Sequence, residues 1–307
     1  MAAPGPVHPL FRTLPVRFRD RAEWGLTRGR LRSSDVSHPF HGVHQLGPAP
    51  TGVRERVDAL APLLRDGDAI SHSTAALLFG AQLPRGLARD PRIHVTTIGG
   101  ADRFRRAGVI GHRAAELPCT LIGSVAVVEP AHVWLQLATM LDLADLIAVG
   151  DRWITPQRDG AARRPAVTTL AELRRVVLAA RGARGAARAR HALPALRVGP
   201  ESRMETHLRL LLLRSGLPEP LVNPTVRVGA DDLHPDLAYL DERVVIEYQG
   251  ERHRTDQRRW RDDMRRRERF ESAGYRVVEA HAGDVFAEPE AFLARVCRIL
   301  ASRRPHT

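Results

Sequence analysis

The stretch His234-Pro-Asp-Leu-Ala-Tyr-Leu-Asp-Glu-Arg-Val-Val-Ile-Glu-Tyr-Gln-Gly-Glu-Arg-His253 decides the fold of the C-terminal part of this chain. Its pattern predicts a strand that carries Asp236, followed by a tight turn at Asp241-Glu242. A second strand is expected from Arg243 to Gln249. Pairing these two strands as a hairpin would bring Asp236 towards Glu247.

The second strand has two chemically different faces. Because side chains alternate across a strand, Glu247 and Gln249 share one face, and the other face carries Val244, Ile246 and Tyr248. Two carboxylates and a polar neighbour at a sheet end make an oxygen-rich pocket of the kind that Mg²⁺ prefers. The alternative is a half-buried hairpin with an inert acidic face, since polar residues outside are typical of an exposed sheet.

This segment resembles the PD-(D/E)XK nuclease superfamily. Pro235-Asp236 matches the first part of the family pattern, and Glu247-Tyr248-Gln249 matches the second. The continuation Gly250-Glu-Arg-His253 is similar to the very-short-patch-repair-endonuclease branch, which includes a bacterial family of unknown function. The resemblance covers roughly residues 200 to 300. It implies an endonuclease that uses Mg²⁺ or Mn²⁺, although Gln249 stands where the family has Lys.

The resemblance also implies roles for individual residues. Asp236 and Glu247 would hold the metal, with the Tyr248 carbonyl as a third ligand and Glu205 contributed by the preceding helix. Gln249 would orient the attacking water, and His253 would supply the charge of the missing lysine. Two simpler readings stay open: Glu205 as an acid that complements the helix dipole, and His253 as a helix-start residue with a local hydrogen bond.

The charge of the chain predicts a polyanionic partner. The net charge is +12 over 307 residues, and all 47 basic residues are arginine. Arginine pairs bidentately with phosphate, so this composition suits nucleic acid, with DNA as the expected partner. A helix expected from Asp256 to Ser272 carries the candidate nucleic-acid-binding residues Arg258, Arg259, Arg261, Arg265, Arg266 and Arg269. Ion pairing within that helix is the alternative, and its core candidates are Trp260, Met264 and Phe270.

Several classes of protein are excluded. There is no apolar run of about 18 residues and no signal-peptide pattern at the N-terminus, so we expect no membrane association and a bacterial cytoplasmic location. Cys119 and Cys297 are too few and too far apart for a disulfide scaffold or a cysteine-ligated metal. The histidines outside the hairpin show no metal-ligand spacing, and His72 fits the start of a helix. The oligomeric state stays open, with a homodimer as the candidate.

The chain is long enough for two domains. Gly199-Pro200 marks the expected boundary. Residues 1–198 are expected to form an α+β domain, which includes one strand over Phe40 to Leu46 and one helix from Pro130 to Val149. Residues 199–307 are expected to form a restriction-endonuclease-like α/β core, a mixed sheet flanked by helices in the order α, β, β, β, α, β, α.

The N-terminal half resembles AbiEi-type antitoxin-like proteins of actinobacteria. The residues that carry this resemblance are Ile70-Ser-His-Ser-Thr-Ala-Ala-Leu-Leu-Phe-Gly-Ala-Gln-Leu-Pro84, Ile93-His-Val-Thr96 and the helix at Pro130. Gly25-Leu-Thr-Arg-Gly-Arg-Leu31 would be the remnant of the winged helix that often precedes this part. Two functions therefore compete: a metal-dependent endonuclease linked to toxin-antitoxin or phage-defence systems, and a non-catalytic DNA-binding regulator that keeps the nuclease fold as a scaffold.

Overall fold

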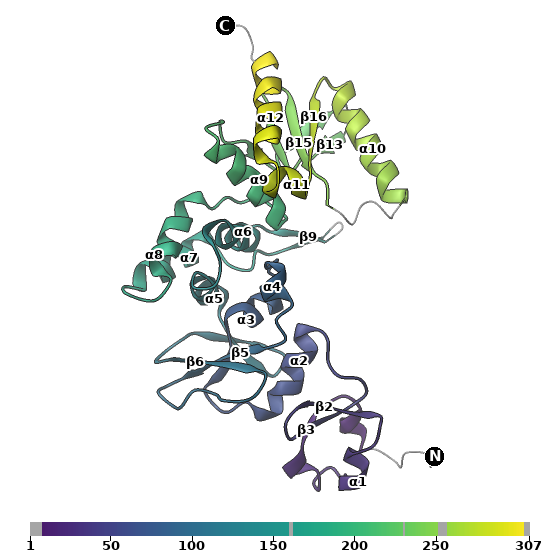
Figure 1. The fold of residues 1–307 in the computed structure, drawn as a ribbon, viewed down its shortest axis with the longest axis vertical. Coiled ribbons are helices and arrows are strands. Elements are labelled where there is room, and N and C mark those ends of the chain that lie inside the picture. Colours follow the sequence, from purple (N-terminus) through teal and green to yellow (C-terminus); the bar gives the residue numbers. More distant parts are fainter. Residues whose placement is uncertain (1–7, 160–161, 230, 251–256, 304–307) are drawn as a thin grey trace. The chain divides into compact units, whose positions relative to one another are not determined.

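The computed structural model describes residues 8–159, 162–229, 231–250 and 257–303, and it shows a mixed α/β architecture of several sheets flanked by helices (Figure 1). The chain forms two compact units, Met1–Met140 with Ala179–Gly185 and Leu141–Leu178 with Ala186–Thr307. The division therefore falls earlier than the boundary expected at Gly199-Pro200. Its cause is the packing of the helix Leu143–Ile154 on the helix Arg203–Arg214. No helix in the described ranges is long and apolar enough to cross a membrane.

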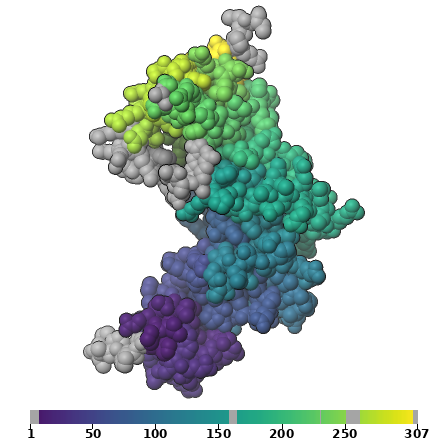
Figure 2. Space-filling model, turned by 180° about the vertical axis from the view of Figure 1, so that it is seen from behind, coloured from purple at the N-terminus to yellow at the C-terminus, as the bar shows by residue number. Residues whose placement is uncertain are grey.

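The start of the first unit has a small core of its own. Its three-stranded antiparallel sheet has the order β1-β3-β2, and the buried core residues are Phe11, Val16, Leu26, Leu31 and Val36; Figure 2 shows this segment in purple as a filled cluster. The expected single strand over Phe40 to Leu46 is wrong, because the chain turns at Gly42 with a positive φ of 74°. The elements are η1 (Pro9–Arg12), β1 (Val16–Arg17), η2 (Phe18–Asp20), α1 (Arg28–Leu31), β2 (Val36–Phe40) and β3 (Val43–Leu46).

A five-stranded mixed sheet with the order β6-β5-β4-β8-β7 forms the rest of the first unit. Its strands are β4 (Asp68–Ile70), β5 (Ile93–Ile98), β6 (Val109–Ala114), β7 (Cys119–Ile122) and β8 (Val125–Val128). The β5 and β6 strands run parallel with Thr96 opposite His112, and β4 runs antiparallel to β5. The accompanying helices are α2 (Val53–Leu60), η3 (Ala61–Leu63), α3 (His72–Leu78), α4 (Arg85–Ala88) and α5 (Pro130–Leu137).

The single helix expected from Pro130 to Val149 is also corrected. The first helix, α5, ends at Leu137, and a second helix, α6 (Leu143–Ile154), begins after Asp142. The Asp142 side chain accepts a 2.8 Å hydrogen bond from the Asp145 backbone N–H. That N-cap satisfies a backbone donor at a new helix start, which explains the break. Next come a hairpin and three short helical elements: β9 (Gln157–Asp159), β10 (Ala162–Arg164), α7 (Leu170–Ala179), α8 (Ala186–Ala192) and η4 (Leu193–Ala195).

The C-terminal sheet has the order β11-β14-β15-β16, in which β14 and β15 are antiparallel and β15 and β16 are parallel. The helix α10 covers one face, and α9, α11 and α12 pack on the other (Figure 1). Phe270 is fully buried, whereas Met264, an expected core residue, is 39% exposed. The elements are α9 (Arg203–Arg214), β11 (Leu221–Val222), a separate ribbon of β12 (Val226–Val228) and β13 (Asp231–Leu233), β14 (Leu237–Tyr239), β15 (Val244–Tyr248), α10 (Gln257–Ser272), β16 (Arg276–Ala280), α11 (Ala282–Phe286) and α12 (Pro289–Arg303).

Candidate functional site

The β14–β15 hairpin sets two carboxylates side by side. Leu237 pairs with Ile246, and extending this register by one residue places Asp236 opposite Glu247. Residues directly opposite in an antiparallel pair project on the same face, and here that is the face covered by α10, because Val245 and Ala238 pack in the α10 core. Asp236 Oδ2 accepts a 2.7 Å hydrogen bond from the Tyr248 backbone N–H, which anchors the carboxylate at the end of the sheet.

A third carboxylate comes from the first turn of α9. Ser202 caps this helix by accepting a hydrogen bond from the Glu205 backbone N–H, and Glu205 Oε2 accepts a 2.7 Å hydrogen bond from the Glu201 backbone N–H. The Glu205 residue is only 8% exposed. Burial and, after it, the negative charge of Asp236 together raise the pKa of Glu205 to about 8. Glu205 therefore resists ionisation because it is buried beside another acid.

Glu247 is also buried beside Asp236, and Arg266 is a cation that partly compensates its charge. Burial and the Asp236 charge raise the pKa of Glu247 to about 7, whereas the guanidinium of Arg266 opposes that rise. Arg266 Nε and Nη2 lie 3.2 and 3.0 Å from Glu247 Oε1. The Arg266 side chain also donates to the His234 carbonyl and lies over the Phe270 ring. Arg266 therefore compensates the charge of Glu247, and Arg152 is a cation that interacts electrostatically with Glu205.

The other predicted residues divide into three groups. Gln249 is half-buried, and its backbone N–H donates to the Ala280 carbonyl at 2.8 Å. Of the predicted nucleic-acid-binding arginines, Arg265 is exposed, Arg269 pairs with Asp231, and Arg266 belongs to the acidic cluster. Outside the described part of the chain lie His253 and the side chains of Arg258, Arg259, Arg261 and Trp260.

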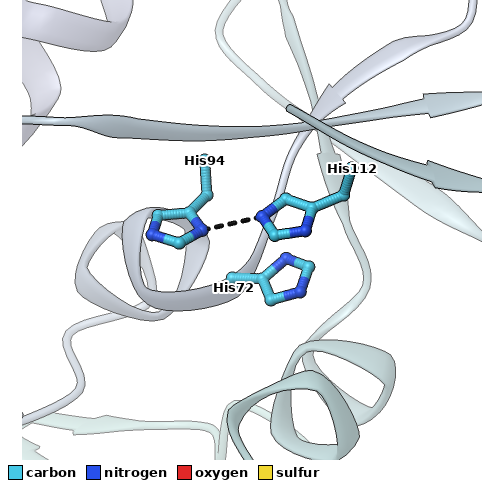
Figure 3. A group of neighbouring side chains, drawn as sticks. All are labelled: His72, His94 and His112. Atoms are coloured by element: carbon cyan, nitrogen blue, oxygen red, sulfur yellow. Dashed lines mark hydrogen bonds between the residues drawn. The ribbon is translucent and has the colours of Figure 1, made fainter. Parts of the chain in front are cut away.

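A group of histidines was missed from the sequence. His72, His94 and His112 converge in the first unit, and their ligand nitrogens all lie within 4.8 Å of one another (Figure 3). The interpretation that the histidines outside the hairpin are scattered is therefore wrong for these three.

Local spacing could not have revealed the histidine cluster, because each residue belongs to a different element. The signal was present only in the pairing of strands: Thr96 lies opposite His112, and His94 lies two residues before Thr96 on the same face. Burial, followed by the charges of His112 and His94, lowers the pKa of His72 to about 3. Burial also lowers the pKa of His94 to about 4 and that of His112. All three imidazoles are thus neutral at pH 7.

Comparison with known proteins identifies relatives but no family. The chain is 27% identical over 232 residues to uncharacterized protein Rv2248 of Mycobacterium tuberculosis, an alignment that covers 75% of this chain and 80% of that protein. The same values hold for uncharacterized protein MT2308 from a second strain of that organism. No protein-family model matches the chain, and no solved structure matches it significantly.

Proposed function

We propose that the C-terminal unit is a metal-dependent DNA endonuclease of the restriction-endonuclease-like type, acting with Mg²⁺ or Mn²⁺. The observation that carries this proposal is the gathering of Glu205, Asp236 and Glu247 at one end of a mixed sheet, where Arg266 pairs with Glu247. Neighbouring buried acids destabilise a fold, because like charges repel and burial disfavours the charged form. Stability alone therefore does not explain why these three acids lie together. Perturbed carboxylates of this kind cluster at functional sites.

The donor set fits a hard divalent cation. All three side chains offer carboxylate oxygens, and their mutual repulsion, seen in the raised pKa values of Glu205 and Glu247, is the repulsion that a divalent cation relieves. Mg²⁺ keeps several of its own waters, so it does not need all three carboxylates in direct contact. When bound, the cation would polarise a phosphoryl oxygen and lower the pKa of a bound water.

The chain's own residues hold this site in place. The Tyr248 backbone N–H orients Asp236, and the N-terminal turn of α9 orients Glu205. With a pKa of about 7 in the absence of a cation, Glu247 keeps part of its proton at neutral pH, and a bound cation would displace that proton. Its position beside Asp236 puts that proton within the same acidic cluster.

Arg266 supplies the positive charge that the sequence pattern lacks. The family position for lysine holds Gln249, but the Arg266 guanidinium contacts Glu247 directly and is held by the His234 carbonyl. A guanidinium stays charged at any ordinary pH, so it can stabilise negative charge that develops on a phosphate, although it cannot act as a base. We therefore assign to Arg266 the electrostatic role that the sequence suggested for His253.

Cleavage of supercoiled plasmid tests the proposal. Wild-type protein should nick DNA with Mg²⁺ or Mn²⁺ and not with a chelator present. Asp236→Asn and Glu247→Gln should each lower the rate about a hundredfold or more, because each removes an anionic ligand with little change in volume. Asp232→Asn, at an exposed carboxylate on β13, is the matched control and should cut like the wild type. Equal cutting by all four proteins would refute the site.

A non-catalytic DNA-binding regulator is the second candidate, and one feature of the first unit favours it. A cavity of about 970 Å³ there is lined by Arg17, Arg19, Arg65 and Arg106, with Phe18 and Phe40 among the apolar walls. Basic and aromatic side chains together suit a phosphate backbone and unstacked bases. A link to toxin-antitoxin or phage-defence systems would follow from the AbiEi-type resemblance of this half.

The two candidates predict different results for the same preparation. A regulator should bind DNA with an affinity that falls steeply between low and moderate salt. It should not cleave DNA, whichever divalent metal is added. Substituting the largely exposed Arg19 by alanine should reduce the salt dependence by about one counterion if that side chain contacts phosphate. Metal-dependent turnover that is lost in Glu247→Gln would eliminate the regulator as the sole function.

A further inference from the structure

Three histidines from separate elements meet above the β4–β5–β6 part of the five-stranded sheet. His94 lies on β5 and His112 on β6, and both project on the face that α3 covers. His72 is the first residue of α3 and directly follows Ser71, whose backbone N–H donates to the His94 carbonyl at 3.0 Å. The pairing of β4 with β5 therefore delivers the start of α3 to the other two histidines.

The rings lie close enough to share a small ligand. His94 Nδ1 is 2.9 Å from His112 Nε2, and the His72 ring lies against the His112 ring with 3.7 Å between centroids (Figure 3). Two nitrogens of a tetrahedral zinc site, with Zn–N near 2.0–2.1 Å, would be roughly 3.3 Å apart. The His94–His112 pair needs to open by only a few tenths of an ångström to reach that spacing.

The backbone around His72 is held in an unusual conformation. His72 has a φ of 50°, in the left-handed region that residues other than glycine seldom adopt. Its backbone N–H donates to Gln136 Oε1 at 2.9 Å, and Ser71 Oγ lies 3.0 Å from His72 Nδ1 and accepts a hydrogen bond from Thr96. Local strain that neighbours over-determine in this way clusters at ligand clamps.

We propose that His72, His94 and His112 form a binding site for a divalent transition-metal cation, with Zn²⁺ as the expected ion. Neutral imidazole is the ligand that zinc, copper, nickel and iron favour, whereas Mg²⁺ prefers oxygen. Three histidine ligands leave a fourth position open to water or to another small ligand. This site differs in chemistry and in unit from the carboxylate cluster, so the two bind different ions.

The experiment measures zinc binding to the full-length chain, produced without a histidine tag and freed of metal by chelation. Titration with Zn²⁺ should show one equivalent bound with a dissociation constant of about 1 µM or tighter. Both His94→Gln and His112→Gln should weaken binding at least tenfold. His191→Gln, at an exposed histidine on α8, is the control for binding to surface histidines. Glu247→Gln should bind Zn²⁺ like the wild type, which separates this site from the proposed nuclease site.

Two further measurements keep the result decisive. Circular dichroism verifies that each variant folds, and because His94 is buried, the half-buried His112 decides the outcome if His94→Gln does not fold. Co²⁺ in place of zinc should produce visible absorption of four- or five-coordinate geometry in the wild type and not in His112→Gln. The proposal fails if the wild type binds no stoichiometric zinc, if His112→Gln binds as tightly as the wild type, or if His191→Gln loses as much as His112→Gln.

Discussion

Two acidic regions of the second unit involve the same helix, α9, and differ in the number of cationic partners that their acids contact. Burial raises the pKa of an acid in both, to about 6 for Asp151 and about 8 for Glu205. In the first, Asp151 of α6 is fully buried and accepts hydrogen bonds from Arg209 Nη2 and Thr206 Oγ1, both at 2.9 Å, and from the Arg197 backbone N–H at 2.7 Å. Arg209 also pairs with Glu219 at 2.8 Å. Nearby, Asp145 is paired with both Arg203 and His207. Each acid of this region therefore has a cationic partner.

The second region is the cluster of Glu205, Asp236 and Glu247, in which Arg266 pairs with Glu247. Both regions hold buried carboxylates, so burial alone does not distinguish a structural site from a functional one. The difference lies in compensation: a buried charge that only supports the fold needs its partner inside the protein. In the second region, burial and the charge of Asp236 raise the pKa values of Glu205 and Glu247, a repulsion that a bound cation would relieve, and the following predictions test that distinction.

The largest expected effect belongs to the compensated region. Arg209→Met should lower the free energy of unfolding by about 3–5 kcal/mol, because it leaves Asp151 buried without its counterion. Denaturant unfolding at pH 7 measures the change. Adding Asp151→Asn to Arg209→Met should recover part of the loss, because the uncompensated charge is then gone. A loss below about 1 kcal/mol would show that Asp151 is neutral in the folded protein.

Replacing Glu205 in the acidic cluster should raise the free energy of unfolding, whereas Arg209→Met lowers it. The folded-state pKa of Glu205 is about 8, above the usual 4.5, so the folded state holds this proton more tightly than the unfolded chain does. The stability linked to that proton is complete below pH ~4.5 and is lost as the pH rises through about 8. At pH 9 Glu205→Gln should therefore be more stable than the wild type, by on the order of 2 kcal/mol, and the two should differ little at pH 5.

Thermal melts at both pH values, without divalent cations, check the Glu205→Gln prediction. Glu268→Gln, at an exposed glutamate of α10, serves as the control and should show no such pH dependence. If Glu205→Gln is equally or less stable than the wild type at pH 9, burial and the charge of Asp236 do not raise the pKa of Glu205 in the folded protein.

Binding of Mg²⁺ should raise the free energy of unfolding by a smaller amount. At ten times its dissociation constant, Mg²⁺ should stabilise the wild type by about 1.4 kcal/mol through mass action. Glu247→Gln should show little of this gain, and His112→Gln should keep it, because the histidines are not expected to bind Mg²⁺. Differential scanning calorimetry at several Mg²⁺ concentrations measures it. A gain that survives Glu247→Gln would place the cation elsewhere.

The smallest effect is expected at an exposed ion pair between the two strands of the β12–β13 ribbon. Arg227 Nη1 lies 2.9 Å from Asp232 Oδ1, but both side chains are largely exposed. Arg227→Gln should leave the melting temperature unchanged within experimental error, since solvent screens such pairs. A marked drop in melting temperature would show that an ion pair in this unit stabilises the fold even when both side chains are exposed.

Local rules predicted the hairpin well. Alternation placed Val244 and Ile246 on one face and Glu247 on the other, and these faces pack as expected. The helix predicted over Asp256 to Ser272 corresponds to α10. The turn at Gly42 was missed because two short strands and their turn occupy the length of one ordinary strand.

The sequence by itself determined which side chains share a strand face, the helix that forms α10, and that the chain is strongly basic. These properties depend on neighbours a few residues apart, which is the distance over which helix and strand periods act. Only the tertiary structure decided that Arg266 contacts Glu247, that Arg209 neutralises Asp151, and that three distant histidines meet. Those contacts depend on the order in which strands pair and on how helices dock against them, and no local spacing in the chain records either.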